Sequence, residues 1–130
     1  MKKEPYQKWL ERVEYDIATA GAMYKTKRYI YAVFMCQQAL EKCFKAMMSY
    51  KGMEVIPVHN LRRLAEKIDI IQEMTSEELR KMDFLSQYYL NARYKEDIEE
   101  LSKHINKSTS ENYIKFSREK IKWLSLKMKP

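Results

Sequence analysis

The chain has 130 residues, of which 45% are apolar and 33% charged, a balance typical of one folded domain and not of a disordered chain. It contains only two glycines and three prolines, which excludes a glycine-rich phosphate loop and disfavours the many tight turns of an all-β fold. The formal net charge of +7 favours a polyanionic partner, although a solvated lysine-rich face explains the same excess.

Two long helices are predicted in the first half of the chain. Apolar residues recur at steps of three and four from Pro5 to about Lys25, and proline suits the first turn of a helix. The second helix, from about Arg28 to Tyr50, is apolar around most of its circumference, so most of its faces must be buried. Such a helix is either central in the bundle or has one face against another subunit. Because three neighbouring helices would not cover all of its faces, we expect a dimer.

A loop and two further helices are predicted next. Residues 53–59 contain a proline and are predicted to form the loop, after which Asn60 caps a shorter helix with apolar positions up to Ile71. A capping box at residues 75–78 opens a fourth helix, whose apolar stripe reaches Ala92.

The last third of the chain is predicted to hold one more long helix. Residues 93–107 are expected to contribute a short helical turn. Ser108 and Glu111 form a second capping box, which opens a fifth helix that runs to about Lys127. The predicted fold is all-α, an up-and-down bundle of four main helices plus a short one, which forms a single domain over residues 1–130 and pairs as a dimer.

The few histidines and cysteines disfavour several chemistries. Cys36, Cys43, His59 and His104 are the only residues of these types, and their spacing matches no metal-binding motif. The longest apolar run, residues 29–36, is too short to span a bilayer, and we expect no signal peptide at the start of the chain. We expect no metal, no cofactor and no membrane partner, and two unpaired thiols favour a cytoplasmic location.

Two lysines of the second predicted helix are candidates for phosphate binding. Lys42 and Lys45 lie three residues apart on one helix face, so both ammonium groups could reach one phosphate. The alternative is that Glu41 and Lys45, one turn apart, form an ordinary surface ion pair. Gln37 and Gln38 interrupt the apolar surface, so their amides need partners across helices or across a dimer interface.

Three further candidates flank the shorter predicted helices. His59 either binds an anion with the backbone amides at the start of the third helix or ties the loop to the second helix. Arg93 offers a fork for phosphate and Tyr94 a ring for base stacking, although both also suit structural roles at a helix end. His104 follows an acidic block at residues 96–100 and is an acid–base candidate only where the fold brings it to Arg93.

Four segments of the chain form a recognisable series. They are Trp9-x3-Val13-x2-Asp16-Ile17-x2-Ala20, Gln37-Gln38-Ala39-x-Glu41-Lys42-x2-Lys45-Ala46, His59-Asn60-Leu61 and Tyr89-x3-Arg93-Tyr94. In this order and spacing they resemble the HEPN domain family, named for higher eukaryotes and prokaryotes nucleotide-binding. The resemblance covers about residues 9–125, and the run that begins with the two glutamines is its most specific part.

The resemblance implies an up-and-down helical bundle that usually dimerises. Small prokaryotic members are often encoded beside minimal nucleotidyltransferases and behave as toxin–antitoxin-like pairs. Many members are ribonucleases in which an arginine is followed after four to six residues by a histidine, and the motif is read across a dimer cleft. Here ten residues separate Arg93 from His104, and Lys95 stands where close relatives often carry proline, so the ribonuclease motif is not present at its usual spacing.

The residues and the resemblance together suggest a nucleotide- or RNA-interacting module that acts with a separately encoded nucleotidyltransferase. The expected phosphate ligands are Lys42, Lys45, His59 and Arg93, with Tyr94 stacking a base. Two alternatives stay open. One is a metal-independent ribonuclease that uses Arg93 and His104, and the other is a non-catalytic scaffold that binds a protein partner.

Overall fold

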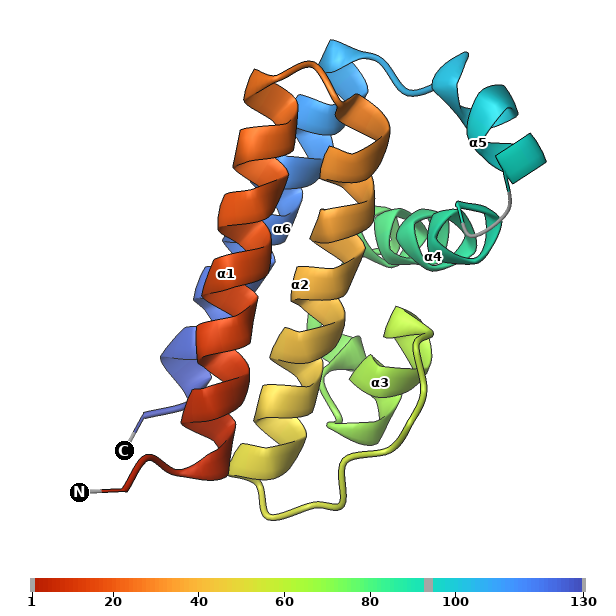
Figure 1. Ribbon diagram of the computed structural model, residues 1–130. Coiled ribbons are helices and arrows are strands. Elements are labelled where there is room, and N and C mark those ends of the chain that lie inside the picture. Colours follow the sequence, from red (N-terminus) through yellow and green to blue (C-terminus); the bar gives the residue numbers. More distant parts are fainter. Residues whose placement is uncertain (1, 93–94, 130) are drawn as a thin grey trace.

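The computed structural model describes residues 2–92 and 95–129, and every regular element within them is helical (Figure 1). The helices are α1 (Pro5–Lys25), α2 (Tyr29–Tyr50), α3 (Leu61–Lys67), α4 (Ser76–Asn91), α5 (Lys95–Ser102) and α6 (Lys107–Lys127), with a 3-10 turn η1 (Ile71–Glu73) before α4. Helices α1, α2 and α6 lie side by side, and α3, α4 and α5 gather on the other side of α2. The prediction of an all-α fold is confirmed.

The first two helices have the predicted bounds to within one residue. Glu4 precedes α1 and forms a capping box with Gln7, whose side-chain oxygen accepts the Glu4 backbone N–H at 2.9 Å. Lys27 lies between the helices with φ of 65°, so the chain reverses within a few residues. As a result α1 and α2 run antiparallel and pack along most of their length.

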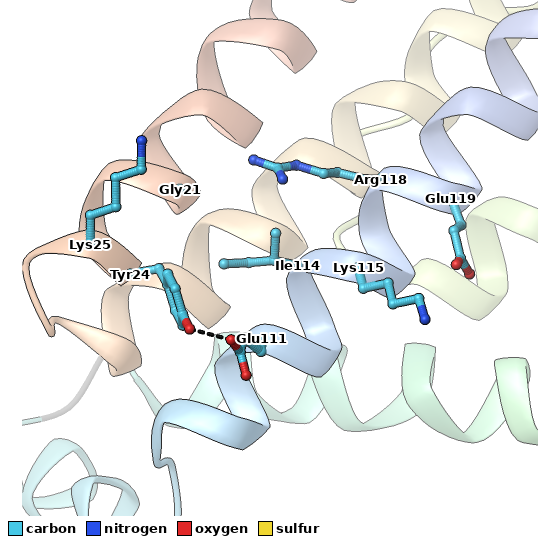
Figure 2. A pocket seen from close by; sticks show the side chains of 8 residues that line it. All are labelled: Gly21, Tyr24, Lys25, Glu111, Ile114, Lys115, Arg118 and Glu119. Atoms are coloured by element: carbon cyan, nitrogen blue, oxygen red, sulfur yellow. Dashed lines mark hydrogen bonds between the residues drawn. The ribbon is translucent and has the colours of Figure 1, made fainter.

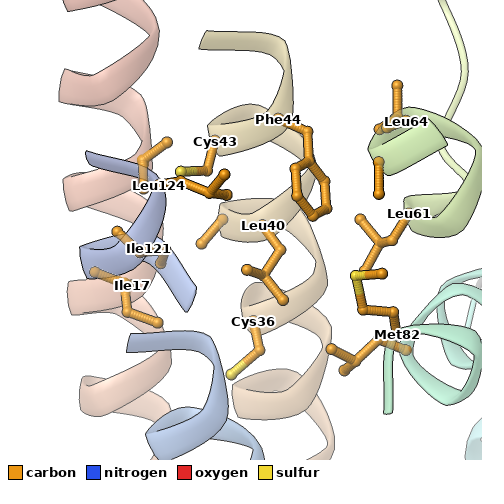
Figure 3. Packing of buried hydrophobic residues seen from close by; sticks show 14 of the residues in the cluster. Ile17, Cys36, Leu40, Cys43, Phe44, Leu61, Leu64, Met82, Ile121 and Leu124 are labelled. Atoms are coloured by element: carbon orange, nitrogen blue, oxygen red, sulfur yellow. The ribbon is translucent and has the colours of Figure 1, made fainter. Parts of the chain in front are cut away.

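Helix α2 separates two layers of apolar packing (Figure 3). On one side Cys43 lies near Leu124 of α6, in the layer that α1 and α6 share with α2. On the other side Phe44 points toward Leu61 of α3, and Met82 of α4 continues this second layer. A helix with apolar packing on both sides must be apolar around most of its circumference, which accounts for the composition of α2.

The sequence argument that a second copy must cover α2 is wrong in its premise. Thirteen of the 22 residues of α2 are buried within one chain. The neighbours that bury them are α1, α3, α4, α5 and α6, more than the three helices that the argument assumed. Among the large hydrophobic side chains of α2, only Tyr31 and Tyr50 are exposed. The apolar composition of α2 therefore gives no reason of its own for dimerisation.

The third helix is shorter than predicted. It begins after Asn60, whose side chain accepts the Arg63 backbone N–H at 3.0 Å as the sequence predicts, but it ends at Lys67 instead of continuing to Ile71. Asp69 adopts φ of 59°, a left-handed conformation that aspartate tolerates better than most residues and that no α-helix continues through. Of the apolar residues beyond Lys67, Ile68 and Ile70 lie in the turn that leads into η1, and Ile71 is the first residue of η1.

The last long helix begins two residues earlier than the capping box of Ser108 and Glu111 predicted. Asn106, and not Ser108, caps α6, and its side-chain oxygen accepts the Thr109 backbone N–H at 2.9 Å. The same oxygen accepts the Thr109 hydroxyl at 3.0 Å. Before it, the segment predicted as a short turn contains the two-turn helix α5.

We expect Asn106→Ala to destabilise the protein by about 0.5–2 kcal/mol, because it leaves the Thr109 backbone N–H at the start of α6 without its acceptor. Urea unfolding followed by circular dichroism measures this change. Ser108→Ala is the matched control, and because Ser108 is exposed we expect it to stay within about 0.5 kcal/mol of the parent protein. A larger loss from Ser108→Ala than from Asn106→Ala would contradict this assignment of the cap.

Both cysteines lie inside the fold. Cys36 and Cys43 are buried and unpaired, and burial raises the pKa of each thiol to about 12. Both thiols are therefore protonated at neutral pH.

Among the helices of the described residues, none combines the length and the apolar character needed to cross a membrane.

Candidate functional site

A buried carboxylate, that of Glu41, organises the polar residues of α2. The Lys45 ammonium lies 2.9 Å from Oε2 of Glu41, one helical turn away, and the Gln37 side-chain amide donates to Oε1 at 3.0 Å. His59, in the loop before α3, places Nδ1 3.0 Å from both carboxylate oxygens. The side chains of Glu41 and Lys45 are only 8% and 9% exposed. The pair that the sequence offered as an alternative to phosphate binding is therefore formed, but it is buried and not at the surface.

The carboxylate of Glu41 is held in its charged form. Burial by itself would raise the pKa of Glu41, but the hydrogen bonds from Lys45, Gln37 and His59 outweigh it and lower the pKa below its usual 4.5. The negative charge is balanced by the ammonium of Lys45. The cluster is thus neutral overall when His59 is neutral, and it presents an acceptor that orients the His59 ring through Nδ1.

Gln37 fixes the loop before α3 to α2. Besides bonding Glu41, its amide nitrogen donates to the backbone carbonyl of His59 at 3.2 Å, and its oxygen accepts from Gln38 at 2.7 Å. The buried amide therefore has partners for both donor hydrogens and for its oxygen. The expected cross-element bond of this glutamine is formed within one chain.

A groove of about 290 Å³ lies outside this cluster, between the loop before α3 and the end of α4. The His59 ring forms one wall with its side chain 50% exposed, and its centre lies 5.2 Å from that of the Tyr89 ring. Arg63 of α3 and Leu90 of α4 complete the rim. An imidazole, a phenol ring and a guanidinium therefore face one groove.

Two of the backbone amides at the start of α3 are already in use. The Leu61 N–H donates to the Ser86 hydroxyl at 2.9 Å, and the Arg63 N–H donates to the Asn60 side chain at 3.0 Å. These two groups are not available to an anion, contrary to one of the two roles considered for His59.

Two neighbouring arginines of α3 differ in their pairing. Arg62 forms a two-point bond with Asp83 of α4, at 3.0 and 2.7 Å. Arg63 is exposed at the groove and forms no ion pair with any described residue. The guanidinium that is available for a ligand is therefore that of Arg63.

Lys42 and Lys45 lie against different carboxylates. Lys42 pairs with Asp16 of α1, which is itself buried, whereas Lys45 pairs with Glu41 on the side of the His59 loop. The structure thus brings Lys45 and His59 together around Glu41 and places Lys42 between α2 and α1. In this chain both lysines neutralise internal carboxylates.

The remaining predicted residues lie away from the cluster or outside the described part of the chain. Arg93 and Tyr94 lie outside the described residues, although they follow Leu90 of the groove by three and four positions in the sequence. His104 has a side chain that is 69% exposed, lies 3.6 Å from Glu100, and does not line the groove. The catalytic pair of Arg93 and His104 stays a prediction.

Three residues of this region carry more of the site than sequence reasoning assigned to them: Glu41, Arg63 and Tyr89. For Glu41 a signal existed, because Gln37, Glu41 and Lys45 recur every four residues within an apolar helix, which indicates a buried polar row. For Arg63 the local sequence gave no indication of a role in the site, because only the fold shows that Arg62, and not Arg63, pairs with Asp83.

Within residues 2–92 and 95–129, no cluster of three or more histidine, cysteine, aspartate or glutamate side chains is arranged to hold a metal.

Comparisons with known proteins agree with this fold. The model of the HEPN domain family matches residues 6–127. The crystal structure of TT1696 from Thermus thermophilus superposes with a TM-score of 0.81 at 18% identity, covering 96% of this chain and 99% of that one. ST0689, described as an archaeal HEPN homologue, superposes with a TM-score of 0.75 at 21% identity, covering 99% of this chain and all of that one. No curated protein sequence matches the chain.

Proposed function

Because the chain belongs to the HEPN domain family, we propose that it is a helical module that binds a nucleotide or RNA in the groove beside His59. The observation that carries this proposal is the arrangement of three different side chains around one groove. His59 is oriented by Glu41, Tyr89 stands beside it, and Arg63 lies on the rim without an ion pair among the described residues.

Each of these groups suits one part of a nucleotide. The guanidinium of Arg63 can donate two parallel hydrogen bonds to a phosphate. The ring of Tyr89, which stacks with Phe34 and lies beside His59, lines the groove as an aromatic contact for a base. His59 uses Nδ1 toward Glu41, which leaves Nε2 as the ring nitrogen for a ligand. In this proposal Lys45 acts indirectly, because it keeps the Glu41 carboxylate charged, and Lys42 has a structural role.

The sequence near the groove extends the proposal. Arg93 and Tyr94 follow the groove residue Leu90 closely in the chain, so we assign them to additional phosphate and base contacts of the same ligand. From the family resemblance we further propose that the protein works as a homodimer with a separately encoded nucleotidyltransferase, in a toxin–antitoxin-like pair. Light scattering of the purified chain, and co-purification with the product of a neighbouring nucleotidyltransferase gene, test these two assignments.

We expect Arg63→Gln and His59→Ala each to weaken binding of a single-stranded RNA of about ten nucleotides by about tenfold. The physical reason is the loss of a charge-assisted hydrogen bond to phosphate in the first variant and of a ring contact in the second. Fluorescence anisotropy of a labelled RNA at about 50 mM salt measures the affinity, and the parent protein should bind more weakly as salt rises.

Arg80→Gln is the matched control, because Arg80 is an exposed arginine on α4 about 13 Å along the helix from Tyr89. It removes the same charge without touching the groove. Equal losses in Arg63→Gln and Arg80→Gln would show that only net charge matters and would contradict the proposed site. A parent protein with no saturable RNA or nucleotide binding would favour the role of a protein-binding scaffold.

A further inference from the structure

A second groove, of about 430 Å³, lies between α1 and α6 and shares no lining residue with the groove at His59 (Figure 2). It exists because α1 packs closely along α2 and only sparsely along α6. Ile114 of α6 points into the space between the two helices and is buried. The groove is large enough for a small organic ligand.

One end of the groove is fixed by a hydrogen bond between the two helices. The Tyr24 hydroxyl of α1 donates to the carboxylate of Glu111 of α6. This hydrogen bond, together with burial, raises the pKa of Tyr24 to about 12. The bond joins α1 to α6 with the Tyr24 ring as one wall of the groove, and it engages Glu111, one of the two acidic side chains of the lining.

Two cations face the groove from opposite walls. Arg118 extends from α6 toward α1, and Lys25 stands on the α1 side, one turn beyond Gly21. Neither of these cations forms an ion pair or a hydrogen bond with any described residue. By contrast, Lys120 and Lys127 on the same helix α6 are paired with Glu78 and Glu73.

Gly21 allows the close approach of Arg118. A Cβ atom at Gly21 would lie 3.2 Å from Nη2 of Arg118, so an alanine there would require the guanidinium to shift by a few tenths of an ångström, and a larger side chain would require a larger shift. Glycine is among the poorest helix formers, yet it stands inside α1 at the point that the guanidinium approaches. The sequence thus keeps this wall of the groove open where a positive charge lies.

We propose that this groove binds a phosphate monoester of about mononucleotide size. The phosphate lies between Arg118 and Lys25, because two cations from opposite walls suit a doubly charged anion. The flat or apolar body of the ligand packs against Tyr24 and Ile114. Lys115 and the carboxylate of Glu119 also belong to the lining, and Figure 2 shows both side chains directed away from α1.

Isothermal titration calorimetry at low salt tests the proposal, with adenosine monophosphate as the probe. We expect saturable binding of this probe, and at least about tenfold weaker binding of adenosine and of inorganic phosphate, since each lacks one half of the ligand. Arg118→Gln should weaken binding of the probe by about tenfold or more. Gly21→Leu should do the same without changing charge, because it fills the groove, and leucine is a better helix former than glycine.

Lys8→Gln is the control, since it removes one charge from an exposed position at the far end of α1. Affinity that stays within about twofold of the parent value in both Arg118→Gln and Gly21→Leu would overturn the proposal, as would adenosine binding as tightly as the probe. Arg63→Gln separates the two grooves. Loss of the probe in Arg63→Gln but not in Arg118→Gln would place the ligand at His59 and overturn the assignment made here.

Discussion

Replacing Glu41 by glutamine is expected to destabilise the fold by about 3–5 kcal/mol, because the variant leaves the buried Lys45 ammonium without its counter-charge. His59 and Gln37 would also lose the carboxylate that both of them contact. Urea unfolding of the parent and the variant, analysed with a common slope, gives this difference.

Two companion variants make the test specific. Asp83→Asn removes one partner of the exposed pair with Arg62, and we expect it to cost about 1 kcal/mol or less. Adding Lys45→Met to Glu41→Gln removes the stranded charge and should restore a large part of the lost stability. If Glu41→Gln cost no more than Asp83→Asn, the cluster would not be the buried, coupled unit described above.

The same carboxylate gives the stability of the protein a defined acid dependence. The folded pKa of Glu41 lies below its unfolded value of about 4.5, so its contribution to stability is complete above that pH and is lost as the pH falls through the folded pKa. Unfolding curves taken between neutral pH and about pH 3 should therefore converge for the parent and Glu41→Gln. Curves that stayed parallel over this range would contradict the assigned direction of the shift.

The second large effect is expected from Phe44→Ala, at about 3–5 kcal/mol. Phe44 is 1% exposed and fills the layer between α2 and α3, where it points toward Leu61 (Figure 3). Removing the ring leaves a cavity that neighbouring side chains only partly fill. Thermal and urea unfolding both report the loss.

Tyr15→Ala serves as the control for Phe44→Ala, because Tyr15 is an aromatic residue of α1 that is 75% exposed. Its loss should change stability by no more than about 0.5 kcal/mol. A cost below about 1.5 kcal/mol for Phe44→Ala would mean that the layer next to α3 is loosely packed, contrary to the structure.

The long helices could be predicted from the sequence because their signals are local. The bounds of α1 and α2 follow from the spacing of apolar residues, from the proline at the start of α1 and from the glycine after α2. The start of α6 was harder to place. Asn106 and Ser108 are equally good capping residues two positions apart, and a local pattern has no means of choosing between them.

The site could be predicted only in part, because its geometry depends on contacts between distant segments. The spacing of Glu41 and Lys45 offered an ion pair as one of two interpretations, but the contact of Glu41 with His59, 18 residues later, is not visible in that spacing. In the same way, the ammonium of Lys42 is held by Asp16, which lies on another helix. Helical spacing shows which residues share a face, and it does not show what covers that face.

Because α2 has apolar packing on both sides, neither half of the molecule has a core of its own. A fragment that ended before α3 would expose the Phe44 side of α2 to water, and such a surface favours aggregation over independent folding. The backbone amides in the middle of α2 should accordingly be the slowest in the chain to exchange with solvent, because they open only when the whole fold does.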